Sequence, residues 1–338
     1  MLINIQILRA YAAIAVAFFH INMPGLSSGS FGVHVFFVIS GFIIAHSFVV
    51  QPDRFFLRRI IRIVPAYWAC TIGIFCIALI RPEWLNSTTA NTGKLLKSLL
   101  FIPYLKENGL MQPVLNVGWT LNYEMFFYLA VSISLWIAGN RYAVALTCVM
   151  LAVILRTLPG LCASDVCSFY ANPISYEFCY GMIAYYLWRK RWLERIPRQM
   201  WMVSCLLFAL ALPLIEARIE LPFSFGTASA GLVFSAAMLE RPFSSVWKKR
   251  FVAIGDASYL IYLIHMYVIE LFNKIAIPIF PVLTLNALFG VSLCLGIIIA
   301  VSIVLHRFLE KPLLDWLKEK LVPRRQHIPA ALAASGGC

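Results

Sequence analysis

Long, uninterrupted runs of apolar residues constrain this sequence more than any other feature. A helix that crosses the hydrocarbon core of a bilayer needs about 20 predominantly apolar residues. Because the runs here are continuous and do not alternate with polar residues, they predict helices and argue against a transmembrane β-barrel. We therefore predict an all-α polytopic membrane protein with about ten transmembrane helices. The predicted spans are 4–22, 31–50, 64–80, 119–139, 141–157, 173–188, 200–215, 223–239, 253–275 and 284–306.

The composition agrees with this fold class. Of the 338 residues, 61% are hydrophobic and only 13% are charged, whereas a soluble domain carries about a quarter charged residues. These values exclude a soluble enzyme, a disordered chain and a secreted disulfide scaffold. The net charge of +13 would suggest nucleic acid in a soluble protein. In a membrane protein we attribute it to the basic loops that fix topology, so we predict no nucleic-acid partner.

The distribution of basic residues predicts the orientation of the chain. Cytoplasmic loops of membrane proteins are enriched in Lys and Arg. One set of alternate loops holds 20 of these residues and the other set holds 7, which places both termini in the cytoplasm, as an even number of spans requires. The first apolar run lacks the features of a cleaved signal peptide, so we predict that it is retained.

The predicted domain organisation is simple. Residues 1–322 form a single transmembrane domain, and residues 323–338 form a flexible cytoplasmic tail. The stretch 94–104 is too short to span a bilayer, and we predict an interfacial amphipathic helix there.

Two ionisable residues lie inside the first predicted span. Arg9 falls in its inner half and His20 near its outer end. Eleven residues correspond to three helical turns plus about 20°, so both side chains share one face, roughly 16 Å apart along the axis. They cannot touch, but they can line one passage at two depths. Ionisable groups inside a bilayer are functional candidates because they are costly to bury.

Other polar residues divide between the two membrane faces. Arg54, Arg58, Arg59 and Arg62 lie at the predicted inner face, where guanidinium groups could bind phosphates or simply anchor the topology. His34 and Glu124 are predicted in the outer half, with His34 close to His20. A neutral imidazole is a good general base near neutral pH, and a neighbouring carboxylate can orient it.

Several residues have plain structural explanations. Two explanations are open for His46 and His265: each could form an interhelical hydrogen bond, or each could have a functional role. Glu177 and Glu270 are best explained as wetted helix ends, and Asp256 as a helix cap. Cys162 and Cys167 share a loop predicted to be outside, where they could be bonded or free.

Six segments of the chain resemble, in order, motifs of the acyltransferase 3 family of integral membrane acyltransferases, and in particular its exopolysaccharide-production branch. Together they cover nearly the whole sequence, which makes the resemblance specific. The segments are LRA at 8–10 followed by His20, GVHVFFVISGFI at 32–43, FLRRIIRIVP at 56–65, GWTLNYEMFFY at 118–128, GDASY at 255–259 and LEKP at 309–312.

The resemblance implies transfer of an acyl group, usually acetyl, from cytoplasmic acyl-CoA to a hydroxyl of a glycan or glycolipid at the bacterial inner membrane. It implies an essential role for His20, and it links Arg9, Arg59 and Arg62 to acyl-CoA. Glu124 carries over from a third motif of the family. At the position where the family commonly has Asp, this chain has His34. We therefore predict that Glu124 is the acid that orients His20.

These observations give a mechanistic hypothesis. The phosphates of acetyl-CoA, or of another acyl-CoA, bind Arg59 and Arg62 with help from Arg58, and the thioester reaches His20 inside the membrane. His20 takes the proton of the attacking hydroxyl, and His34 could stabilise the oxyanion. We predict no metal.

Three alternatives remain open from the sequence. Ser40 is a candidate for a covalent acyl-enzyme. A transporter or flippase for a lipid-linked glycan would also explain intramembrane charges. An assembly subunit with a decayed catalytic pocket is the third.

Overall fold

The computed structural model describes residues 2–22, 28–86, 88–191, 193, 195–218, 224–240, 246–285 and 287–322. Within these ranges the regular elements are helices, as predicted, and the pairing of Leu105 with Met111 is an isolated bridge. The α-helices are α1 (Ile3–Ile21), α2 (Phe31–Val50), α3 (Phe55–Ile80), α4 (Thr92–Leu99), α5 (Trp119–Leu161), α6 (Asp165–Tyr170), α7 (Tyr176–Arg189), α8 (Arg198–Arg218), α9 (Ser224–Met238), α10 (Val246–Asp256), α11 (Ser258–Leu271), α12 (Ile277–Ile279), α13 (Leu288–Leu305) and α14 (Lys311–Leu321).

Seven helical segments in the described part of the chain are long and apolar enough to cross a membrane, and the protein is a multi-pass membrane protein. The predicted spans 173–188 and 223–239 correspond to α7 and α9, which have only 14 and 15 residues. The count of ten spans and the cytoplasmic placement of both termini stay predictions. The seven segments are Ile3–Ile21, Phe31–Val50, Phe55–Ile80, Asn116–Leu161, Arg198–Glu216, Ser258–Ile279 and Leu288–Leu321.

Some predicted boundaries differ from the structure. Helix α5 covers both 119–139 and 141–157, and the two parts are separated by a kink at Gly139, whose φ of 61° is not helical. The predicted span 253–275 is divided, because α10 ends at Asp256 and α11 begins at Ser258. The helix predicted over 94–104 is present as α4, which covers only Thr92–Leu99, and its place at the membrane interface stays a prediction. The Asn91 side chain caps α4 by accepting the Lys94 backbone N–H at 3.0 Å. The predicted tail, 323–338, lies outside the described residues.

Helix α3 begins earlier than the predicted span 64–80. It starts at Phe55, so Arg58, Arg59 and Arg62 belong to its first turns instead of a loop. Arg59 and Arg62 are three residues apart and therefore point to one side of the helix.

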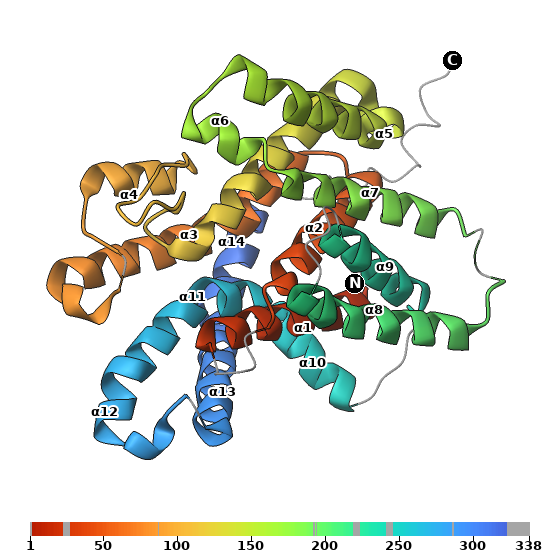
Figure 1. Ribbon diagram of the computed structural model, residues 1–338. Coiled ribbons are helices and arrows are strands. Elements are labelled where there is room, and N and C mark those ends of the chain that lie inside the picture. Colours follow the sequence, from red (N-terminus) through yellow and green to blue (C-terminus); the bar gives the residue numbers. More distant parts are fainter. Residues whose placement is uncertain are drawn as a thin grey trace, which may run out of the picture.

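Helix α1 lies near the centre of the molecule, in contact with α2, α10 and α11 (Figure 1). Small side chains make this close packing possible, because they let neighbouring backbones approach. On α1, the buried alanines are Ala10, Ala12, Ala13 and Ala17. The beginning of α1 is held by Glu240, whose carboxylate accepts the backbone N–H groups of Ile3 at 2.8 Å and Asn4 at 2.9 Å. A carboxylate at a helix N-terminus satisfies otherwise unpaired donors.

Two glycines let α2 and α7 pack backbone against backbone. A Cβ atom added to Gly41 would collide with the carbonyl oxygen of Phe178, and one added to Gly181 would collide with the carbonyl oxygen of Val38. The interface between α2 and α7 therefore depends on the absence of side chains at both positions.

The segment that connects α3 to α5 folds back on α3, at the side of the molecule where α3 and α4 lie together in Figure 1. The Tyr67 hydroxyl donates to the Ser98 carbonyl at 3.1 Å, and the indole N–H of Trp68 donates to the Leu99 carbonyl at 2.9 Å. Lys106 lies in this segment with only 5% of its surface exposed, and its ammonium donates to the Asn116 side chain at 2.5 Å.

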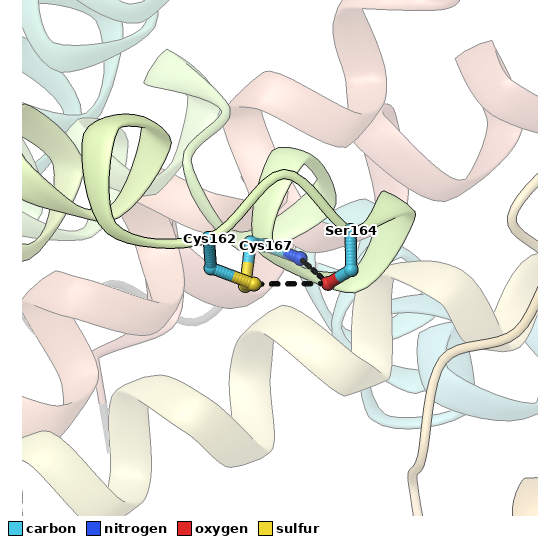
Figure 2. The surroundings of a disulfide bond; sticks show 3 residues. All are labelled: Cys162, Ser164 and Cys167. Carbon is cyan, nitrogen blue, oxygen red and sulfur yellow. Dashed lines mark hydrogen bonds between the residues drawn. A yellow bond between two sulfur atoms is a disulfide. The ribbon is translucent and has the colours of Figure 1, made fainter.

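Cys162 and Cys167 are joined by a disulfide that closes the turn between α5 and α6, a pairing that the sequence left open (Figure 2). Ser164 lies inside this turn and caps α6, because its hydroxyl accepts the backbone N–H of Cys167 at 3.3 Å. A disulfide persists in an oxidising compartment, which is where the predicted orientation places this turn.

We expect Gly41→Ala to destabilise the protein by about 1–3 kcal/mol, because the new methyl group overpacks the interface with α7. Gly73→Ala on α3 is the matched control, since nothing lies within 4 Å of a Cβ at that position and alanine favours helix by up to about 1 kcal/mol. Thermal unfolding in detergent measures both. Equal melting temperatures for the two variants would contradict this account of the interface.

We expect Lys106 to make stability depend on pH. Burial lowers the pKa of its ammonium group from 10.5 to about 8, because the charged form loses hydration. Between pH 8 and pH 10.5 the unfolded chain therefore binds more protons at this residue, and the free energy of unfolding rises with pH. Lys106→Met should flatten this rise in thermal unfolding measured across that range. Identical pH profiles for the wild type and the variant would refute the assignment.

Candidate active site

A cavity of about 130 Å³ lies between α1, α2, α3, α5 and α11. Arg9, Arg59 and Arg62 all line it, together with Glu124. Three cations and one carboxylate around one cavity favour an anionic ligand, because guanidinium groups stay charged and form forked hydrogen bonds. The structure thus brings together four of the site residues predicted from the sequence.

Arg9 is held by Gln6 on its own helix, α1, and Gln6 is held in turn by α10. Its guanidinium donates to the Gln6 side-chain carbonyl at 2.9 Å, and the Gln6 amide donates to Asp256 at the end of α10. The prediction that Asp256 caps a helix was wrong, because Ala257 occupies the N-cap position of α11 and has no side-chain acceptor. Asp256 instead supports the residue that orients Arg9.

Arg62 is held by a carboxylate from the segment 309–312, to which no role was assigned from the sequence. Glu310, 4% exposed, accepts from Arg62 at 3.3 Å and is also 2.7 Å from His306 Nδ1. These two residues come from the π-helix His306–Glu310 that joins α13 to α14. Since 248 residues separate Arg62 from Glu310, only the fold brings them together.

The other basic residues at the start of α3 differ in their surroundings. Arg59 packs over the Phe55 ring at 5.6 Å, and its Nε is buried without a hydrogen-bond partner among the described residues. A buried unpaired donor beside a cavity is expected to meet a ligand or water there. Arg58 donates to the Gln51 carbonyl and is not among the cavity-lining residues, and Arg54 donates to the Leu321 carbonyl at 2.7 Å.

Glu124 lies on α5 and contacts two hydroxyl groups. Ser40 Oγ on α2 is 3.3 Å from its carboxylate, and the Tyr128 hydroxyl also donates to it. Ser40, Tyr128 and the α11 residues Tyr259 and Tyr262 line the same cavity. These tyrosines were not predicted as site residues, because the sequence is rich in aromatic residues, 14% of the chain, and nothing local distinguishes them.

His20 contacts a second histidine, not Glu124 or His34. Its Nδ1 is 2.9 Å from the Val16 carbonyl and 3.3 Å from Nε2 of His265 on α11. The two ring centroids are 4.9 Å apart. His265 is fully buried, and Tyr262, which lines the cavity, precedes it by less than one helical turn.

His34 belongs to a separate pair. Its Nδ1 lies 2.6 Å from Glu177 on α7, and its ring stacks on Phe225 of α9 with centroids 4.7 Å apart. The expectation that Glu177 and Glu270 are wetted helix ends was wrong, because their surfaces are only 5% and 8% exposed. Glu177 is buried because α2, α7 and α9 pack around it.

His46 lies away from both groups. Its ring contacts Tyr185 edge-on at 5.6 Å, and its Nδ1 has no hydrogen-bond partner among the described residues. The interhelical hydrogen bond considered for this residue is therefore not made within the described part of the chain.

Comparison with known proteins supports an acyltransferase. The sequence profile of the acyltransferase 3 family, described as an acyltransferase domain, matches residues 2–307. The exopolysaccharide production protein ExoZ of Rhizobium meliloti is 32% identical over 298 residues, which are 85% of this chain and 90% of ExoZ. No solved structure matches the chain.

Two O-acetyltransferases match shorter parts of the chain. The peptidoglycan O-acetyltransferase OatA of Listeria monocytogenes is 29% identical over 37% of this chain and 23% of OatA. The O-acetyltransferase OatA of Staphylococcus aureus strain NCTC 8325 is 35% identical over 22% of this chain and 14% of its own length. The chain therefore belongs to the acyltransferase 3 family and is a membrane O-acyltransferase.

Proposed function

We propose that this protein transfers an acetyl group from cytoplasmic acetyl-CoA to a hydroxyl of a cell-surface glycan or lipid-linked saccharide. The reaction takes place in the bacterial inner membrane, with both termini in the cytoplasm. The observation that carries the proposal is the convergence of Arg9, Arg59 and Arg62 on one cavity. Two of the helices that line this cavity, α1 and α11, also bring His20 and His265 into contact.

The arginines fit the anionic donor. CoA carries phosphate groups, and Arg binds phosphate with bidentate hydrogen bonds. Arg59 has an unpaired buried Nε at the cavity, and Arg62 is oriented by Glu310. Arg58 adds positive charge at the start of α3 without lining the cavity.

The relatives support the acceptor class. ExoZ is named for exopolysaccharide production and OatA for O-acetylation of peptidoglycan. Both names refer to glycans at the cell surface, which offer many hydroxyl groups. We therefore assign the acceptor to this class, and the transferred group to acetyl.

His20 acts as the general base. The acceptor oxygen attacks the thioester carbonyl carbon while its proton moves to His20, and collapse of the tetrahedral intermediate breaks the C–S bond. The proton then passes from His20 to the CoA sulfur, so that the products are the O-acetyl ester and free CoA. A positioned base of this kind contributes about 10²–10⁴-fold to the rate.

Glu124 and His34 have supporting places in this proposal. Glu124 offsets part of the positive charge around the cavity and holds Ser40 and Tyr128. His34 is engaged by Glu177, so we assign it no proton transfer with His20.

We expect His20→Ala to reduce acetyl transfer at least about 100-fold, because the proton acceptor is lost. The assay uses purified protein in lipid nanodiscs, radiolabelled acetyl-CoA, and surface polysaccharide isolated from cells that lack the protein. Incorporated label and released CoA are measured together. Full activity of the variant would refute the role of His20. Passage of polysaccharide through proteoliposomes without release of CoA would instead fit a transporter.

We expect Arg59→Gln and Arg62→Gln each to raise KM for acetyl-CoA about 10- to 100-fold, because each removes a charge-assisted contact to the donor. Arg81→Gln is the matched control, since Arg81 is exposed and pairs with Glu83. Initial rates at varied acetyl-CoA concentration give KM for all three. An unchanged KM in the first two variants would place the donor elsewhere.

A further inference from the structure

His265 is a buried ionisable side chain next to His20, the proposed base. The mechanism above gives His265 no role. It lies on α11, 245 residues from His20 in the sequence, and its surface is fully buried. An imidazole in such a position forms specific hydrogen bonds, because unpaired polar groups inside a membrane protein are costly.

The protonation of His265 follows from its neighbours on α11. Its Nδ1 lies 2.8 Å from the Tyr262 carbonyl oxygen and 3.2 Å from the Ile261 carbonyl oxygen. Carbonyl oxygens only accept hydrogen bonds, so Nδ1 must carry the proton. In the neutral ring, Nε2 is then a lone-pair acceptor, and it faces His20.

The same reasoning applies to His20. Its Nδ1 lies 2.9 Å from the Val16 carbonyl and 3.3 Å from Nε2 of His265. Both neighbours are acceptors, so the His20 Nδ1 carries a proton and shares it between them. The Nε2 of His20 is therefore unprotonated in the neutral ring, as a general base requires.

We propose that His265 is a positioning residue for this reaction: its Nε2 accepts the Nδ1–H of His20, keeps the lone pair of His20 on Nε2, and stabilises the imidazolium formed when His20 takes the acceptor's proton. This inference rests on the proposed function, in which His20 is the base. In place of the carboxylate that usually supports a catalytic histidine, the protein uses a second imidazole whose orientation is fixed by the backbone of α11.

Three substitutions of His265 separate this role from packing. His265→Gln can place an acceptor oxygen near the position of the imidazole Nε2. His265→Asn reaches only the position of Nδ1, so it can bind the α11 carbonyls but not His20. His265→Phe keeps a ring of similar size without any acceptor. The three variants are compared in the nanodisc assay described above, with His20→Ala alongside.

We expect His265→Asn and His265→Phe to lower kcat about 10- to 100-fold, the effect of losing a hydrogen bond to a charged group. KM for acetyl-CoA should be unchanged, because the donor site is intact. His265→Gln should recover most of kcat. Wild-type kcat in the Asn or Phe variant, or equal loss in Gln and Asn, would overturn the inference. If either result occurs while His20→Ala is inactive, the proposed function itself still stands.

A measurement on the wild-type protein complements these variants. Nitrogen NMR of ¹⁵N-histidine-labelled protein distinguishes a protonated from an unprotonated ring nitrogen, and the His20 signals are identified by their loss in His20→Ala. We expect protonated Nδ1 and unprotonated Nε2 at neutral pH. The opposite tautomer would overturn the inference even if every variant at position 265 failed to fold.

Discussion

Dense packing around helix α1 is the constraint on which the rest of this structure depends. Buried alanines on α1 allow α2, α10 and α11 to approach closely, and Gly32 and Gly255 bring two of these helices against the backbone of α1. In a bilayer, lipid is as apolar as the helices, so close van der Waals packing and hydrogen bonds must supply the association energy. The packing places Arg9 and His20 at the points where partners from other helices can meet them.

The polar groups of the site are organised in pairs that cross between helices. Arg9 is connected through Gln6 to Asp256, Arg62 is paired with Glu310, and His20 is paired with His265. Each pair joins distant parts of the sequence. Because ionisable groups inside a membrane protein are costly to leave unpaired, these contacts stabilise the buried groups, and they also fix the geometry that catalysis would use.

The two ends of α1 therefore differ in chemistry. Near its cytoplasmic half, as the predicted topology has it, Arg9 shares a cavity with Arg59 and Arg62, which suits an anionic donor. Toward its other end, His20 and His265 form a neutral pair with a free lone pair, which suits proton transfer from a hydroxyl. A donor that binds at the arginines and reacts at the histidines would need to extend along α1. The distance between Arg9 and His20 along the helix axis is roughly 16 Å.

The sequence by itself determined the all-helical membrane class, the family, and all three arginines that line the cavity. The length of the apolar runs determines the membrane class, and short local motifs determine the family and the arginines. The partners of those residues were decided only by the tertiary structure. From the sequence we predicted Glu124 as the support for His20, whereas the structure places His265 beside it. This choice depends on how α1, α5 and α11 pack, and such interhelical contacts leave no local pattern in the sequence.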